Sequence, residues 1–480
     1  MVAVAACSSS DGGGTPISDG RAGTGGSKGA GGSKGTGGSV GKGGSAGASA
    51  GGASGASDGT GGAGPSGGNT DASDPDNGDV GSPGPTSDGG TGGTTGADAA
   101  AGRDGSTAPA DTGGGTPGQA YKIDGVATWK GNAEAAYSIV HDDVCDSSAA
   151  GVFKHADPEL TKRGLHAGFG AIVSECGTAE APWSDIKKLV SHGHDVFSHS
   201  WDHKCIASVA ICTEQAGATE PRSTDFATEL GKAGTTLAAQ TGVPVQFYIA
   251  PYDACDPAAL TYLKGQGYVG ARCGEHGASD AAFTDAFHLK YDVWGPSYSQ
   301  YIDPGPAPDA CKGVVMDSDT PLPSGLPAAC REYVFKTYIN DTIKQKGFAM
   351  REMHGFDDDA DAFQPVSLAD YTGHLDWIKT LVDAGTLWVE GPTPVIKYRW
   401  AREKCALPTL SGNTLKFGTP SADCKTNATV LSYLISTTDN SDPATIKTMQ
   451  GTVAHMGRKL GPGKFVVDAD PTKGDAVISQ

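Results

Sequence analysis

From Tyr121 onward, short apolar runs alternate with amphipathic stretches, a pattern that predicts strands followed by helices. The predicted strands are residues 136–141, 167–173, 195–199, 245–250, 268–271, 287–293 and 348–354. The predicted helices are residues 158–163, 183–191, 224–241, 257–265, 330–345 and 367–384. Strands that alternate with helices over about 260 residues indicate a parallel α/β fold, and an α/β barrel fits this length. We therefore expect functional side chains at the carboxyl ends of the strands.

After Cys405 the pattern changes to short strands without helices of useful length. Residues 414–417, 428–436, 448–455 and 464–468 have strand character and are separated by Gly, Pro, Asn and Asp. We therefore divide this part of the chain into a barrel over residues 121–404 and a small β-sandwich-like module over residues 405–480. The module either packs against the barrel and stabilises it or binds glycan, and the sequence leaves both roles open.

The first 120 residues have a different composition. They contain 40 of the 73 glycines and no Phe, Trp, Tyr or Leu. Such a segment buries too little apolar surface to offset the entropy of folding. We expect residues 8–120 to be a disordered Gly/Ser/Thr/Asp linker.

A lipid anchor is the expected link to a membrane. Val4-Ala5-Ala6-Cys7 resembles a bacterial lipobox, so residues 1–7 are interpreted as the remnant of a signal with Cys7 as the lipidated residue. The alternative is an unpaired thiol on a disordered tail. The chain has no run of about 18 to 20 apolar residues, so we expect membrane contact only through the anchor.

Charge and cysteine content narrow the class of protein. The formal net charge is −19, and an acidic surface repels phosphate backbones, which excludes nucleic acid as a partner. Ten of the eleven cysteines follow residue 120, and no two form a C-x-x-C pair. We expect five disulfides among these ten, and hence an oxidising compartment outside the cytoplasm.

Candidate metal ligands follow three of the predicted strands. Asp142 and Asp143 follow the first strand, His199 and His203 follow the third, and His354 ends the last. Each element alone is common in proteins, because adjacent aspartates often form a solvated turn and pairs of histidines arise by chance. Together, two imidazoles and one carboxylate leave open positions on a divalent metal, as a hydrolytic site requires.

The same residues carry a resemblance to a known family, the polysaccharide deacetylases with NodB homology. Residues 199–203 match its His-Ser/Thr-x-x-His motif in full, and Val140-His141-Asp142-Asp143 corresponds to its Thr-Phe-Asp-Asp motif. The remaining motifs correspond to Ala250-Pro251-Tyr252, Asp292-Val293-Trp294 and Met353-His354. The resemblance covers about 270 residues and implies a metal-dependent carbohydrate deacetylase on a distorted barrel.

The resemblance also implies roles for individual residues. Asp143, His199 and His203 would hold one divalent metal ion, with zinc as the expected ion. Asp142 would be the general base that takes a proton from the attacking water.

The other implied roles concern the substrate and the leaving group. His354 would protonate the departing amine, and Asp292 would fix its tautomer. Pro251 and Tyr252 would bind substrate, with the backbone N–H of Tyr252 at the oxyanion. Trp294 would wall the acetyl pocket.

Three positions depart from the family pattern or add to it. Ile249 replaces the arginine that pairs with the catalytic base, so the base is expected to lack that partner. His141 replaces an aromatic residue and either repacks or supplies the lost positive charge. Glu352 is either an added polar group near the site or a barrel-interior partner for Arg351 or Arg272.

The disulfide prediction starts from the metal ligands. Cys145 and Cys205 each lie two residues after a ligand, and ligands of one ion lie close together, so we expect these two cysteines to pair. The predicted pairs are Cys145–Cys205, Cys176–Cys212, Cys255–Cys273, Cys311–Cys330 and Cys405–Cys424.

The sequence thus predicts a metal-dependent hydrolase that removes N-acetyl groups from a chitin-like or peptidoglycan-like polysaccharide. One alternative is an O-acetyl esterase of the xylan type with the same site, and another is a non-catalytic surface protein that binds glycan. The partner is expected to be the acetylated polysaccharide, and the chain is expected to be a monomer. Its expected location is extracytoplasmic, either lipid-anchored at the outer membrane or cell surface, or secreted.

Overall fold

The computed structural model describes residues 121–177, 180–293, 309–311, 327–360, 362–438 and 441–480. Three sequence predictions lie outside these residues: the signal-like segment 1–7 with Cys7, the linker 8–120, and the pocket residue Trp294.

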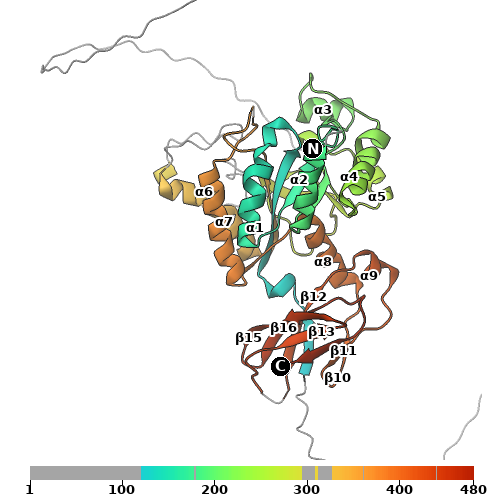
Figure 1. Cartoon of the computed structure of the whole chain (residues 1–480), viewed down its shortest axis with the longest axis vertical. Helices are drawn as coiled ribbons and strands as arrows, with labels where there is room; N and C mark the ends of the chain where they lie inside the picture. Colours follow the sequence, from blue (N-terminus) through green and yellow to red (C-terminus); the bar gives the residue numbers. More distant parts are fainter. Residues whose placement is uncertain (1–120, 178–179, 294–308, 312–326, 361, 439–440) are drawn as a thin grey trace, which may run out of the picture. The chain divides into compact units, whose positions relative to one another are not determined.

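Seven parallel strands close a barrel within the described part of the chain (Figure 1). Their order around the barrel is β2-β3-β4-β5-β6-β7-β8, and β8 pairs with β2 to complete the ring. The strands are β2 (Ala135–Val144), β3 (Gly168–Ala171), β4 (Asp195–Ser198), β5 (Phe247–Ile249), β6 (Gly270–His276), β7 (Leu289–Val293) and β8 (Phe348–Met353). The predicted barrel and each of its seven predicted strands are confirmed.

The barrel closes along β2, whose two halves pair with different strands on one edge. Its first residues pair with β9 (Leu387–Val389), and the residues from Val140 onward pair with β3. On the other edge, β8 pairs with β2 as far as His141. The carboxyl end of β2 therefore lies between the ends of β3 and β8.

Helices cover the outside of the barrel (Figure 1). They are α1 (Asp157–Arg163), α2 (Glu180–Ser191), α3 (Val209–Gln215), α4 (Ala233–Thr241), α5 (Pro257–Gly265), α6 (Ala328–Gln345), α7 (Leu368–Asp383) and α8 (Pro392–Lys404). Local signals set their ends: Ser367 caps α7 by accepting the N–H of Asp370 at 3.1 Å, and Gly164 ends α1 with a left-handed backbone (φ 62°). Helices α3 and α8 were not predicted. No helix within the described ranges combines the length and apolar character that a membrane span requires.

The carboxyl-terminal module consists of two antiparallel sheets that share one buried apolar cluster, including Leu415, Tyr433, Phe465 and Ile478. One sheet has the order β1-β12-β16-β15 and the other β10-β11-β17-β13-β14. Its elements are β1 (Tyr121–Val126), β10 (Thr409–Ser411), β11 (Thr414–Lys416), α9 (Ala422–Thr426), β12 (Leu431–Thr437), β13 (Lys447–Gln450), β14 (Val453–Met456), β15 (Arg458–Gly461), β16 (Lys464–Ala469) and β17 (Ala476–Ser479).

The module differs from the prediction in three respects. Strands β10, β15 and β17 were not predicted. Strand β1, which the sequence assigned to the barrel, pairs with β12, so the segment that enters the described fold belongs to the module's sheet. The strand predicted over residues 448–455 is a hairpin of β13 and β14, because Gly451 adopts φ 59° and turns the chain back.

Candidate active site

Three metal-competent side chains meet at the carboxyl ends of β2 and β4. The Oδ1 atom of Asp143 lies 3.3 Å from Nε2 of His199 and 3.4 Å from Nε2 of His203. Their ligand atoms all lie within 4.8 Å of one another, as one shared ion requires. Asp143 and His203 have left-handed backbones, with φ of 58° and 52°, and these turns aim both side chains at the same point.

Hydrogen bonds prepare this triad for a metal ion. His199 donates Nδ1–H to the carbonyl oxygen of Ile249 at 3.1 Å, which leaves the lone pair of Nε2 facing Asp143. Burial lowers the pKa of His203 to about 4, so its ring is neutral at pH 7. Oδ1 of Asp143 is buried and has no hydrogen-bond donor among the described residues. An oxygen in this state fits a metal ligand, so the residues fit the divalent ion.

The predicted base, Asp142, has a guanidinium partner that the sequence motif did not reveal. Arg272 donates from Nη1 and Nη2 to the two carboxylate oxygens of Asp142, at 3.1 and 2.7 Å. Arg272 lies on β6, and its partner in the pairing with β5 is Ile249. The guanidinium thus comes from the strand next to the one that carries Ile249, at the same level of the barrel. The expectation that Asp142 lacks an arginine partner is therefore wrong.

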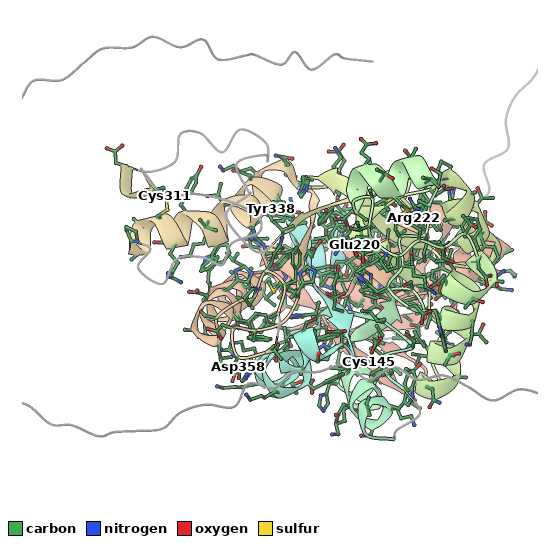
Figure 2. The ribbon with its side chains drawn as sticks, turned by 90° about the horizontal axis from the view of Figure 1, so that it is seen from above. Cys145, Glu220, Arg222, Cys311, Tyr338 and Asp358 are labelled. Carbon is green, nitrogen blue, oxygen red and sulfur yellow. A yellow bond between two sulfur atoms is a disulfide. The ribbon has the colours of Figure 1, made fainter. Side chains whose placement is uncertain are left out.

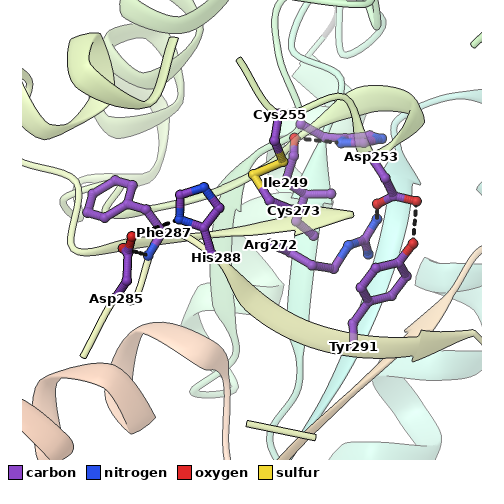
Figure 3. The surroundings of a disulfide bond; sticks show 10 residues. Ile249, Asp253, Cys255, Arg272, Cys273, Asp285, Phe287, His288 and Tyr291 are labelled. Carbon is purple, nitrogen blue, oxygen red and sulfur yellow. Dashed lines mark hydrogen bonds and ion pairs between the residues drawn. A yellow bond between two sulfur atoms is a disulfide. The ribbon is translucent and has the colours of Figure 1, made fainter. Parts of the chain in front are cut away.

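Arg272 is the centre of a larger network, of which Figure 3 shows the contacts among Arg272, Asp253 and Tyr291. Its Nη2 also lies 3.1 Å from Oδ1 of Asp253 and 2.9 Å from Oε2 of Glu352. Tyr291 donates its hydroxyl to the other oxygen of Asp253 at 2.5 Å. One guanidinium cannot neutralise three carboxylates, and burial raises the pKa of Glu352 well above its usual range although Arg272 opposes this. The pairing of Glu352 with Arg272 confirms one predicted role of Glu352, and its place in the cavity beside His354 agrees with the other.

His141 repacks and does not replace the arginine's charge. Burial lowers its pKa to about 4, so the ring is neutral. It donates Nδ1–H to the backbone carbonyl of His354 at 3.0 Å, and its Nε2 accepts the hydroxyl of Tyr371 at 3.1 Å. His141 thus fixes the backbone at the end of β8.

The predicted acid, His354, faces the triad, but its predicted partner does not. Nε2 of His354 lies 3.9 Å from Oδ2 of Asp143 and 3.5 Å from Oε1 of Glu352. Asp292 neighbours Tyr291 on β7 and so points to the opposite face of the strand, where it lies 3.5 Å from Arg351. The carboxyl group that accompanies His354 is therefore that of Glu352, which comes from the same strand.

One cavity of about 510 Å³ is lined by the metal-competent triad and by Asp142, Arg272, Glu352 and His354, and Tyr252 adds an aromatic wall. The ring of Tyr252 lies 4.9 Å from that of His203, and its left-handed backbone (φ 58°) turns the chain directly after Pro251. The hydroxyl of Tyr252 donates to Glu220 at 3.1 Å. Pro251 is buried beneath this turn.

The disulfides fasten the loops around the cavity, but two predicted pairs are wrong. Cys145 pairs with Cys176 and Cys205 with Cys212, in place of Cys145–Cys205 and Cys176–Cys212. The loops after β2 and β3 are neighbours because these strands pair, and Cys205 closes a turn of seven residues onto α3. Figure 2 labels Cys145 on the loop after β2. The pairs Cys255–Cys273, Cys311–Cys330 and Cys405–Cys424 agree with the prediction.

A second group of metal-competent residues, Asp157, His192 and His194, does not suit a metal ion. Nδ1 of His194 accepts the backbone N–H of Ala167 at 3.2 Å, so its Nε2 carries the proton. That Nε2–H donates to Oδ1 of Asp157 at 3.2 Å, and His192 also binds this oxygen, at 2.7 Å. With its hydrogen bonds satisfied, this cluster is structural.

Part of the barrel matches the sequence model of a known protein family. Residues 134–271 match the family model described as polysaccharide deacetylase. The matched segment includes β2 to β5 with Asp142, Asp143, His199 and His203. No curated protein matches the chain.

Several solved structures resemble the chain at low identity. The Xyl-CE4 domain of a multidomain xylanase from the hindgut metagenome of Trinervitermes trinervoides is 13% identical, with 55% of this chain and 90% of that chain covered and a TM-score of 0.32. A family 4 acetyl xylan esterase from Clostridium thermocellum, in complex with a cobalt ion, is 13% identical, with 54% and 89% covered and a TM-score of 0.31. A CE4 family pseudoenzyme from Bacillus anthracis is 12% identical, with 55% and 66% covered and a TM-score of 0.33. At these values, no function of these proteins transfers to this chain.

Proposed function

We propose that the barrel is a metal-dependent hydrolase that removes N-acetyl groups from a polysaccharide of the chitin or peptidoglycan type. The family match supports deacetylase or esterase activity at the coarser level. The observation that carries the proposal is the joint placement of Asp143, His199, His203, Asp142 and His354 around one cavity.

Asp143, His199 and His203 would hold one divalent ion, for which zinc suits the two imidazoles and the carboxylate. Such an ion, when bound, activates water and polarises the acetyl carbonyl group. The pKa of His199 is raised because Asp143 and Asp142 favour its charged form against the effect of burial, so a proton competes with the metal for Nε2.

Asp142 takes the proton of the attacking water in this mechanism. Arg272 fixes the orientation of its carboxylate through two hydrogen bonds. The backbone N–H of Tyr252, which follows the turn at Pro251, is proposed to stabilise the oxyanion.

His354 delivers a proton to the leaving group. An amine leaves only after protonation, so a general acid close to the leaving group raises the rate of amide hydrolysis more than that of ester hydrolysis. Glu352 lies 3.5 Å from Nε2 of His354 and orients the ring in place of Asp292. This arrangement favours N-deacetylation over the ester alternative.

The non-catalytic alternative finds less support. Arg272 restores the positive charge beside the base, so the replacement at Ile249 does not disable the site. In the described part of the module, Tyr433 and Phe465 are buried and Phe417 is half-buried, so these rings offer no exposed platform for sugar. We propose that the module stabilises the barrel, since Tyr398 and Ala401 of α8 join its buried cluster.

The proposed location is extracytoplasmic, and the five disulfides of the described residues are consistent with an oxidising compartment. We also propose that the chain acts as a monomer held by a lipid on Cys7 through the linker 8–120.

The test is acetate release by the full chain from an N-acetylglucosamine tetramer and from an acetylated xylotetraose. We expect release from the first substrate, with kcat/KM at least tenfold above that for the second, and loss of both in Asp142→Asn. A preference for the xylan substrate would assign the esterase alternative. No release from either substrate would contradict the proposed function.

A further inference from the structure

One aromatic side chain is exposed at the mouth of the catalytic cavity. Phe363 is 51% exposed, and it is the only aromatic residue among the exposed large apolar side chains of the described residues. Its ring lies 5.0 Å from the ring of His354, at an interplanar angle of 89°. Both residues line the cavity that holds the metal triad.

The loop that carries Phe363 is fixed at its base. The N–H of Asp357 donates to the carbonyl of Val366 at 3.1 Å, and the N–H of Val366 donates to the carbonyl of Gly355 at 3.2 Å. Phe356 and Val366, which end the loop, are buried. Two buried apolar residues therefore hold the ends of the loop in place, and the loop does not need the exposed ring of Phe363 for its stability.

Two further contacts hold the loop. The carboxylate of Asp358, labelled in Figure 2, pairs with Lys154 and with Nε2 of His155 at 3.0 Å. Gln364 follows the exposed ring with a left-handed backbone, φ 42°, an arrangement that costs energy for a residue with a side chain. The backbone thus presents Phe363 to the cavity in a set position.

The cavity that Phe363 lines also has polar lining residues. Gln364, Gln215, Asp253 and His276 line the same cavity and offer hydrogen-bond donors and acceptors. A pyranose ring needs both kinds of partner, since its C–H groups form an apolar face and its hydroxyl and acetamido groups need hydrogen bonds. An aromatic face has a negative quadrupole that attracts such C–H groups.

We propose that Phe363 is a stacking platform that holds one pyranose ring of the substrate beside His354. This inference rests on the proposed function and deepens it, because it makes the sugar ring, and not the acetyl group alone, a recognised part of the substrate. Phe363 is then a specificity-determining residue, and a small acetylated molecule without a sugar gains little from it.

A competing role for the ring is to orient His354 by packing against it. The two roles differ in their dependence on substrate. Loss of a contact that positions His354 lowers kcat for every acetamide substrate by the same factor, whereas loss of a sugar platform raises KM for glycans alone.

The experiment compares kcat/KM of the full, metal-loaded chain for an N-acetylglucosamine tetramer and for N-acetylethanolamine, an acetamide without a sugar whose amine also needs a proton to leave. In Phe363→Ala we expect the ratio of the two values to fall about tenfold, through a higher KM for the tetramer, and in Phe363→Trp we expect it to be retained. Leu368→Ala, which removes an exposed apolar side chain outside the cavity, is the matched control and should keep the ratio of the parent. An equal loss on both substrates, or no loss on either, overturns the inference.

A binding measurement separates this inference from the proposed function. If the parent releases no acetate from any substrate, the proposed function fails, and titration calorimetry with glucosamine tetramer still tests the platform. We expect Kd to rise about tenfold in Phe363→Ala. An unchanged Kd overturns the platform whatever the activity.

Discussion

At the scale of single residues, Arg272 sets the electrostatics of the cavity. It is buried and pairs with Asp142, Asp253 and Glu352, so its removal leaves carboxylates in a site with little solvent. Breaking a buried ion pair by removing one partner costs roughly 3–5 kcal/mol. The same change releases the proposed base from its fixed orientation.

The first prediction concerns this arginine. Arg272→Gln should lower kcat for the tetramer about a hundredfold or more. Arg272→Lys keeps the charge without the paired hydrogen bonds, so its kcat should lie between those of Arg272→Gln and the parent. Arg399→Gln is the matched control, because Arg399 is also buried but pairs with Glu403 away from the cavity. Its kcat per folded molecule should stay within twofold of the parent. An unchanged kcat in Arg272→Gln would remove Arg272 from the mechanism.

The second prediction separates two candidate partners of His354. Glu352→Gln should lower kcat about tenfold with little change in KM, because Glu352 lies beside Nε2 of His354. Asp292→Asn should lower stability and leave kcat within twofold, because Asp292 pairs with Arg351 on the other face of β7. Steady-state kinetics and urea unfolding measure both effects. The reverse pattern would favour the role that the sequence motif assigned to Asp292.

The sequence predicts the proposed metal ligands better than their partners. Asp143, His199 and His203 are recognised by spacing, and the structure brings all three together. Glu352 was predicted as a polar group near the site or a partner of Arg272. The contacts of Arg272 with Asp142 and of Glu352 with His354 were not predicted, because motif spacing compares positions along the chain and not across strands. The signal that would have found Arg272 is the pairing of β5 with β6, which places Ile249 and Arg272 side by side.

At the scale of elements, disulfides hold the strand-end loops in place. Cys145 follows Asp143 by two residues and has φ 88°, and Cys205 follows His203 by two residues. The prediction that these two cysteines pair was wrong, because two ligands can converge on one ion while the chain after each turns away. Strand pairing is the better guide, since it makes the loops of β2 and β3 neighbours.

The third prediction compares two disulfides. Cys145→Ala with Cys176→Ala should weaken zinc binding about tenfold, because the turn that carries Asp143 loses its cross-link. Cys405→Ala with Cys424→Ala is the control, because this disulfide lies in the module. Each double variant should lose roughly 2–4 kcal/mol of stability, which urea unfolding measures. Equal zinc affinity in both variants, measured by competition with a chelating dye, would show that the cross-link does not support the site.

At the scale of the whole molecule, buried neutral histidines make folding sensitive to acid. His374 is buried in α7, where its Nε2 lies 3.0 Å from the hydroxyl of Tyr137. Burial, together with the charge of Arg351, lowers its pKa well below the ordinary value of 6.5. Below about pH 6.5 the unfolded chain takes up a proton at this residue and the folded chain does not. The stabilising contribution is therefore complete above pH 6.5 and is lost as the pH falls below it.

The fourth prediction concerns this loss of stability at low pH. Between pH 6.5 and pH 5, the unfolding free energy of the parent should fall by up to about 1.4 kcal/mol per pH unit through His374. His374→Gln should lose less over the same interval, and His288→Gln, which changes a solvent-exposed ring, should follow the parent. Urea unfolding of the oxidised protein at pH 7.5, 6.5, 5.7 and 5.0 measures the slopes. Equal slopes in the parent and His374→Gln would contradict this account.

The barrel was predictable because its strands are short apolar runs between clear helical stretches, and these local signals agree with the fold. The module was less predictable: a strand such as β1 carries no mark of its partner, and β1 pairs with β12 some 300 residues later. Long-range pairing of this kind is set by tertiary packing, which local patterns do not contain.

The most direct test of the central claim is acetate release from the N-acetylglucosamine tetramer by the full chain, stripped of divalent metal and then supplied with one equivalent of zinc. We predict loss of release in the stripped protein, recovery in the parent and in Asp157→Asn, and no recovery in Asp143→Asn. Release that persists unchanged after the metal has been removed would contradict a metal centre formed by Asp143, His199 and His203.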